Sequence, residues 1–217
     1  KPRLTVSAAT ITWGQGPRTL EEWNTKSAAM TRVFQDWRSW MAEGILDLNC
    51  LMSYYREARH AEWFRLWIDW AKDNQFGRWA VPSSGVWLNP ISDSIRQIQA
   101  IRSPSKRGNR ARGVLLYCYS STNIGPDGSG QRYNEEFYRA LAVTSAHGSA
   151  PFAKPAIEPQ MPWKTRPKFG HVYGYVRDAN SLEPVDGAIV TASGSGRRVG
   201  RTDGTGFYAF VDMKPGT

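Results

Sequence analysis

Aromatic side chains in this sequence stand where short apolar runs end, at positions where a β-strand would open into a loop. The run LDLNCLMSYY (46–55) ends on Tyr54, and Met52 lies two residues earlier, so both side chains share one face of a strand. Flat aromatic rings can stack on the C–H faces of sugar rings, and a tyrosine hydroxyl adds a polar contact. The pattern indicates a carbohydrate-binding rim, and the alternative for each residue is packing in the core.

Further residues of these types follow the other strand-like runs. Trp13 follows the first run, Trp87 opens the loop after the third, and Asn123 lies in the loop after the fourth. Tyr117 and Tyr119 share one face of the fourth run, and one of them is expected at the rim. The predicted substrate-binding residues are Tyr54, Met52, Trp87, Tyr119, Asn123 and Trp13.

Hydrolysis of a glycosidic bond requires a pair of carboxylates, one as acid and the other as nucleophile or base. Asp36, beside Trp37, and Glu57, just beyond the MSYY strand end, are weak candidates for this role. Asp47 starts its strand, where a role in stability is expected. The catalytic acid and nucleophile are therefore unknown, and we expect them upstream of residue 1.

Strand-like and helix-like runs alternate through the first two thirds of the chain. Apolar spacing of three and four residues predicts helices, and short β-branched or apolar runs predict strands. The expected strands are 4–12, 46–55, 78–87 and 113–121, and the expected helices are 31–44, 60–74, 91–103 and 134–144.

This alternation implies βαβ units and a parallel sheet. The fold class predicted is α/β: the C-terminal half of a (β/α)8 TIM barrel, with a small doubly wound sheet as the alternative. The barrel is preferred because no glycine-rich phosphate loop follows a strand and because polar and aromatic residues gather at the strands' C-terminal ends. We expect the partial barrel over residues 1–145.

The composition changes after this region. Residues 146–169 are rich in proline and predict a stiff linker. Residues 170–217 alternate with period two between Gly, Asp and Asn turns, which predicts a small, truncated all-β sandwich.

Two resemblances to known families support this division. The stretch VFQDWRSWMAEGILDLNCLMSYY (33–55), followed by GVLLYCYSS (113–121), resembles the glycosyl hydrolase-like 10 family of TIM-barrel proteins. Tyr55 stands where chitinase-like barrels have Asp, so chitinase chemistry is not implied. The stretch GYVRDANSLEPVDGAIVTASGSGRRVGRTDGTGFYAF (174–210) resembles a carboxypeptidase regulatory-like, transthyretin-like domain, which implies an accessory role without catalytic residues.

Charge and cysteine content restrict the other classes of function. The net charge of +9 would suit nucleic acid, but Lys and Arg are scattered, and the dense run RSPSKRGNRARG (102–113) reads as a solvated loop. Cys50 and Cys118 are expected to be free, buried thiols. We expect no metal, no cofactor, no nucleic acid and no transmembrane segment.

The function expected is that of a fragment of a secreted or envelope-associated bacterial protein. Its parent would bind, and hydrolyse, glycosidic bonds of a polysaccharide or cell-wall glycan, while this chain alone would be inactive. The alternative is a non-catalytic carbohydrate-binding or scaffold protein of the cell envelope.

Overall fold

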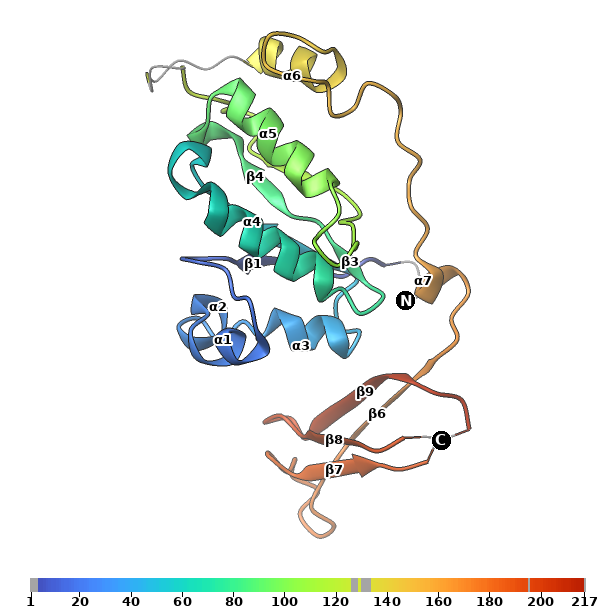
Figure 1. Cartoon of the computed structure of the whole chain (residues 1–217). Helices are drawn as coiled ribbons and strands as arrows, with labels where there is room; N and C mark the ends of the chain where they lie inside the picture. Colours follow the sequence, from blue (N-terminus) through green and yellow to red (C-terminus); the bar gives the residue numbers. More distant parts are fainter. Residues whose placement is uncertain (1–3, 126–128, 130–133, 195, 217) are drawn as a thin grey trace. The chain divides into compact units, whose positions relative to one another are not determined.

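The computed structural model describes residues 4–125, 129, 134–194 and 196–216, and these residues form two compact units (Figure 1). The first, here the N-terminal unit, consists of Thr5–Ala42 and Leu46–Pro159. The second, here the C-terminal unit, consists of residues 160–216 together with Leu4 and Glu43–Ile45.

Parallel strands form the centre of the N-terminal unit. Strands β1 (Ser7–Ile11), β2 (Leu48–Met52) and β3 (Trp79–Ala80) make a three-stranded sheet in that order, with Ile11 opposite Met52. Strands β4 (Ser83–Gly85) and β5 (Leu115–Tyr117) make a separate parallel pair. Each connection between parallel neighbours passes through helical segments, as parallel pairing requires.

The chain changes its strand partner between Val81 and Pro82. The Val81 amide donates to the Asn49 carbonyl of β2 (2.9 Å), whereas the Pro82 carbonyl accepts from the Leu115 amide of β5 (3.0 Å). The run predicted as one strand over 78–87 is two short strands, β3 and β4.

Helices α4 (Glu57–Asp73) and α5 (Ile91–Arg102) lie side by side against these strands (Figure 1). Phe64, Trp67 and Ile68 of α4 pack with Leu51 of β2 in one core cluster. Ile91, Ile95 and Ile98 of α5 join Val86 and Phe137 in a second. The shorter helices of this unit are α1 (Leu20–Thr25), α2 (Ala28–Thr31), α3 (Trp37–Ala42), the 3-10 turn η1 (Val86–Leu88) and α6 (Asn134–Ala142).

Burial alternates along β2 and its extension, and this places the candidate site. Leu51 and Ser53 are buried, whereas Cys50, Met52 and Tyr54 are only half-buried. Since successive side chains of a strand point to opposite faces, the helices cover the face of Leu51, and Met52 and Tyr54 belong to the other face.

The prediction of half a TIM barrel is wrong. The described strands form small sheets of two or three strands, and no barrel is present among them. Parallel βαβ connections produce the same alternation of apolar runs in an open sheet and in a barrel, so the pattern did not separate the two. With β3 two residues long and β5 three, the ladders are too short to extend into a curved, closing sheet.

The C-terminal unit contains two antiparallel strand pairs, and the predicted β-sandwich is also wrong. Strand β6 (Gly170–Tyr175) pairs with β9 (Phe207–Met213), and β7 (Ile189–Ala192) pairs with β8 (Arg198–Arg201). Its buried apolar residues among those described are Phe210 and Met213, which is too little to join two sheets face to face. One helical turn, α7 (Pro162–Thr165), precedes β6.

Residues 146–159 of the proline-rich segment belong to the N-terminal unit and are partly docked on it. The Phe152 amide donates to the Leu141 carbonyl (2.8 Å), and the Phe152 side chain packs against the cluster of α5. The Arg102 guanidinium donates to the Pro151 carbonyl.

Candidate functional site

Three aromatic rings meet at the C-terminal ends of the parallel strands, and we name Tyr54, Trp87 and Tyr117 the aromatic cluster. The ring centroids of Tyr54 and Trp87 are 4.9 Å apart, and those of Trp87 and Tyr117 are 5.3 Å apart, both in edge-to-face arrangements. The two tyrosine rings are 5.2 Å apart and more nearly parallel. All three distances are in the range of direct aromatic packing.

The strands determine this meeting point. Tyr54 lies two residues beyond β2, Trp87 lies in the turn directly after β4, and Tyr117 is the last residue of β5. Gly85 is opposite Tyr117 in the β4–β5 ladder. A Cβ atom at Gly85 would lie 3.1 Å from the Trp87 ring and from Tyr54, so glycine there lets the two side chains approach.

The aromatic cluster is partly open to solvent. Tyr117 is 52% exposed, and Tyr54 and Trp87 are half-buried. Burial raises the pKa of the Tyr54 hydroxyl, against a smaller lowering by a hydrogen bond with Ser83. At neutral pH the hydroxyl is therefore protonated and able to donate or accept a hydrogen bond.

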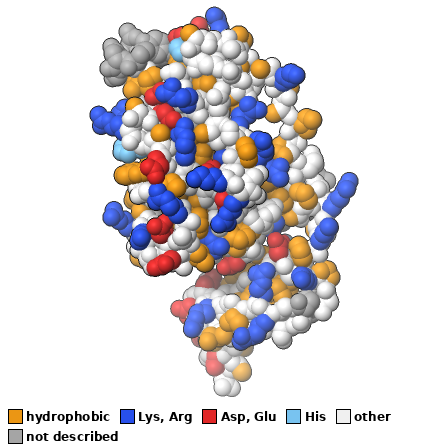
Figure 2. All heavy atoms as spheres, in the orientation of Figure 1, with side chains coloured by type: hydrophobic (Ala, Val, Ile, Leu, Met, Phe, Trp, Pro, Cys, Tyr) orange, Lys and Arg blue, Asp and Glu red, His pale blue; other side chains and the backbone are white. Residues whose placement is uncertain are grey.

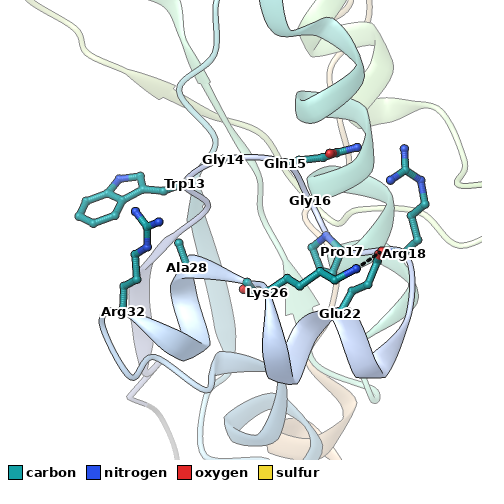
Figure 3. A pocket seen from close by; sticks show the side chains of 11 residues that line it. Trp13, Gly14, Gln15, Gly16, Pro17, Arg18, Glu22, Lys26, Ala28 and Arg32 are labelled. Carbon is teal, nitrogen blue, oxygen red and sulfur yellow. Dashed lines mark hydrogen bonds and ion pairs between the residues drawn. The ribbon is translucent and has the colours of Figure 1, made fainter.

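Trp13 extends the aromatic edge to the neighbouring strand. It follows β1 by two residues, as Tyr54 follows β2, and β1 and β2 are in register through Ile11 and Met52. The Thr12 hydroxyl donates to the Met52 carbonyl (2.9 Å), which keeps the two strand ends adjacent beyond the ladder. Trp13 is 55% exposed and borders a pocket of about 230 Å³ (Figure 3).

The two candidate carboxylates make local structural contacts. Asp36 directly precedes α3; its carboxylate accepts from the Ser39 amide (3.2 Å), as a helix cap does, and from the Trp23 indole (3.2 Å). Glu57 is 8% exposed and forms an ion pair with Arg65 (2.7 Å). The structure does not bring Asp36 or Glu57 into the aromatic cluster.

The remaining two predicted residues are also separate from the aromatic cluster. Tyr119 is 84% exposed, and its ring packs on Tyr138 of α6 with centroids 6.0 Å apart. Asn123 is fully buried, and its amide donates to the Val86 and Asn89 carbonyls and to the Ser94 hydroxyl (2.9 Å). Asn123 thus connects the turn after β4 to α5.

Sequence reasoning did not single out Arg32, Lys26 or Ser27, which line the pocket beside Trp13. They lie on or next to short helices whose side chains show no distinctive spacing. Gly85 was identifiable as a small residue two positions before Trp87, but its role depends on Tyr54, which is distant in sequence.

No protein-family model matches this chain, and no curated protein and no solved structure matches it significantly. The resemblances to the glycosyl hydrolase-like 10 family and to the carboxypeptidase regulatory-like domain are therefore wrong: no family model matches, and the described strands form small, separate sheets. Short motifs of tryptophans, glycines and turn residues recur in unrelated folds, and such motifs carried both resemblances.

Two further features, a metal site and a membrane-spanning helix, are not found in the described part of the chain. There, no group of three His, Cys, Asp or Glu side chains is placed to hold a metal ion, and both cysteines are free. In the same residues, no helix has the length and apolar character needed to cross a lipid bilayer.

Proposed function

We propose that the N-terminal unit binds a polysaccharide through the aromatic cluster. The observation that carries this proposal is the contact of three aromatic rings from three strand ends at a partly exposed position. Aromatic rings offer apolar faces for sugar C–H groups, and the Tyr54 and Tyr117 hydroxyls offer hydrogen bonds to sugar hydroxyls.

The strand-end position supports a site rather than a packing role alone. Ligand sites of parallel sheets lie outside the carboxyl ends of the strands, where loops leave the sheet. Trp13 stands at the end of β1, next to Tyr54 at the end of β2, so aromatic residues border this edge from β1 to β5. Aromatic residues at the ends of four strands, β1, β2, β4 and β5, suit an oligosaccharide better than a single sugar.

The proposal covers binding and not hydrolysis. The Asp36 carboxylate caps α3 and the Glu57 carboxylate is held in an ion pair with Arg65. Glycoside hydrolysis needs two carboxyl groups on either side of one bond.

The charge distribution favours this proposal over nucleic-acid binding. On the face that Figure 2 shows, Lys and Arg side chains are spread out, with Asp and Glu among them. Nucleic-acid sites gather cations along the path of the phosphates.

Binding of the full chain to soluble polysaccharides and cell-wall glycans, measured by calorimetry, tests the proposal. Tyr117→Ala should weaken binding about tenfold, or ~1.4 kcal/mol, because it removes one exposed ring of the aromatic cluster. The matched control is Tyr173→Ala, since Tyr173 is a 70% exposed tyrosine of β6 in the other unit. Equal losses in the two variants, or no glycan bound by the unmodified chain, would refute the proposal.

A further inference from the structure

The pocket beside Trp13, here the β1 pocket, combines an aromatic wall with an excess of positive charge. It is lined by residues 13–18 after β1, and by Glu22, residues 26–28 and Arg32 of the first two helices. Figure 3 shows the Trp13 indole and the Arg32 guanidinium at one side of the pocket and Lys26 and Glu22 at the other. Three cationic residues line it, against one carboxylate.

Among the described residues, most of these charges have partners, but Arg32 does not. The Arg18 guanidinium pairs with Glu62 (2.8 Å), and the Lys26 ammonium is 3.5 Å from Glu22. Glu22 also accepts from the Arg18 amide (2.8 Å), which lowers the pKa of its carboxyl. Within the described residues the Arg32 side chain has no hydrogen-bond or ion-pair partner, so it is available to an anion.

A buried hydroxyl without a partner gives a second and independent indication of a ligand. Ser27 lines the β1 pocket, is 3% exposed, and its Oγ makes no hydrogen bond in the part of the chain that is described. Buried polar groups are almost always paired, because an unpaired one costs about 1–3 kcal/mol. A polar group of a bound ligand would supply the missing partner.

The wall of the β1 pocket is held in place before any ligand arrives. The Gly14 carbonyl accepts two hydrogen bonds, from the Tyr55 hydroxyl (2.8 Å) and from the Trp67 indole (2.9 Å). Gly16 packs so closely on α4 that a Cβ atom there would lie 2.6 Å from the Trp67 amide nitrogen. A fixed wall reduces the ordering cost of binding.

We propose that the β1 pocket binds an acidic sugar residue of the polysaccharide, a uronic acid. Its carboxylate pairs with Arg32, its ring lies against Trp13, and one of its hydroxyls bonds to Ser27. This proposal rests on the function proposed above, because Trp13 and Tyr54 occupy adjacent strand ends, and it specifies the class of glycan.

The charges favour a carboxylate over a phosphate monoester. Arg32 is the one unpaired cation among the described lining residues, and a guanidinium fork fits one carboxylate through two parallel hydrogen bonds. A phosphate monoester brings a charge near −2, which the Glu22 carboxylate across the pocket would oppose. A sulfate ester is also singly charged, so the experiment must separate it from a carboxylate.

The test compares an oligogalacturonate with the same oligosaccharide after methyl esterification of its carboxyls, using calorimetry on the full chain. The unmodified protein should bind the acid form about tenfold more tightly, equivalent to ~1.4 kcal/mol. Arg32→Gln should abolish this preference, because the acid form then loses its ion pair with the guanidinium. Arg112→Gln is the matched control, because Arg112 is an exposed arginine before β5 that does not line the pocket.

Other variants and ligands distinguish a failure of the uronic-acid proposal from a failure of the function proposed for the aromatic cluster. Trp13→Ala should weaken the acid and the ester alike, because the ring contacts the sugar and not its charge. Loss of binding in Tyr117→Ala without any acid preference in the unmodified chain would overturn the uronic-acid proposal alone. An acid preference that depends on Arg32, together with no loss of glycan affinity in Tyr117→Ala, would overturn the function proposed for the aromatic cluster. Equal binding of a sulfated neutral oligosaccharide would refute the assignment to a carboxylate.

Discussion

The Tyr55 hydroxyl connects the core of the N-terminal unit to the β1 pocket. Tyr55 is 8% exposed, and its hydroxyl donates to the Gly14 carbonyl. Burial raises the pKa of Tyr55 from 10.0 to about 12. Between these two values the unfolded chain has lost the proton and the folded chain has kept it, so stability must fall as the pH rises through this window.

Replacing this hydroxyl should remove that alkaline loss. The shift corresponds to ~3 kcal/mol of unfolding free energy lost by the unmodified chain between pH 10 and pH 12. Tyr55→Phe lacks this hydrogen bond and should therefore be about 1 kcal/mol less stable than the unmodified chain at pH 7. Its unfolding free energy should then decline less steeply as the pH rises. Urea unfolding at a series of pH values, followed by tryptophan fluorescence, measures both effects. Tyr173→Phe, at an exposed tyrosine, should follow the unmodified profile; parallel profiles for Tyr55→Phe and the unmodified chain would contradict the assignment.

Residue types alone indicated part of the site. Tyr54 and Trp87 were recognisable because aromatic residues directly after apolar runs are expected at strand ends. The sequence did not decide between Tyr117 and Tyr119, because both tyrosines lie on the same face of the strand expected over 113–121. The strand stops at Tyr117 since its partner β4 ends at Gly85, opposite Tyr117, where the chain turns into η1.

At the scale of elements, the packing of the loop after β1 against α4 shapes the β1 pocket. Gly16→Ala should destabilise the chain by ~1–3 kcal/mol, because the new methyl group meets the backbone of Leu66 and Trp67. The clash cannot be relieved by a side-chain rotation, so the loop must move. Binding of the oligogalacturonate should therefore weaken as well.

Two other glycines provide graded controls for this change, measured by urea unfolding. A Cβ atom at Gly14 would meet open space, but Gly14 has a φ of +73°. Gly14→Ala should therefore lower the unfolding free energy by about 1–2 kcal/mol through backbone strain. Gly204→Ala meets no atom within 4 Å and should leave stability nearly unchanged. A Gly16→Ala variant as stable as Gly204→Ala would show that the loop does not depend on this contact.

The helices differ in how well their sequences predicted them. The isoleucine spacing of 91–103 gave α5 almost to the residue, because one continuous apolar face packs on the strands. The helix expected over 31–44 is instead α2 and α3, separated at Phe34, which has a φ of +54° and an 82% exposed side chain. In this break the Gln35 side chain accepts from the Ile11 amide of β1 (2.8 Å). That contact links residues 24 positions apart, so it could not be predicted from helical periodicity.

At the scale of the whole molecule, local pattern predicted parallel pairing but not how far the sheet extends. Apolar alternation reports which face of a strand is buried, and it is the same for an open sheet and a barrel. Closure depends on ladder length and curvature, and the ladders here are limited by the two-residue β3 and the three-residue β5. The period-two pattern of the last fifty residues likewise predicted strands, whereas assembly into a sandwich would need more buried apolar residues than this unit contributes.

The division into two units predicts that stability and binding can be separated. Phe210 of β9 is 6% exposed in the C-terminal unit, and Phe210→Ala should destabilise that unit by about 3–5 kcal/mol. The aromatic cluster and the β1 pocket are built from residues of the N-terminal unit alone. The affinity for glycan should therefore change less than twofold, although one calorimetric unfolding transition moves to lower temperature.

The reciprocal variant is Trp37→Ala, because Trp37 is fully buried in the N-terminal unit and packs on Trp23 with ring centroids 4.6 Å apart. Its loss should lower the other transition and reduce the amount of binding-competent protein, since α1 and α3 lose their shared core. Scanning calorimetry and glycan binding on both variants distinguish the units. A tenfold loss of affinity in Phe210→Ala would mean that the binding site extends into the C-terminal unit. A single calorimetric transition, shifted equally by both variants, would mean that the two units unfold as one.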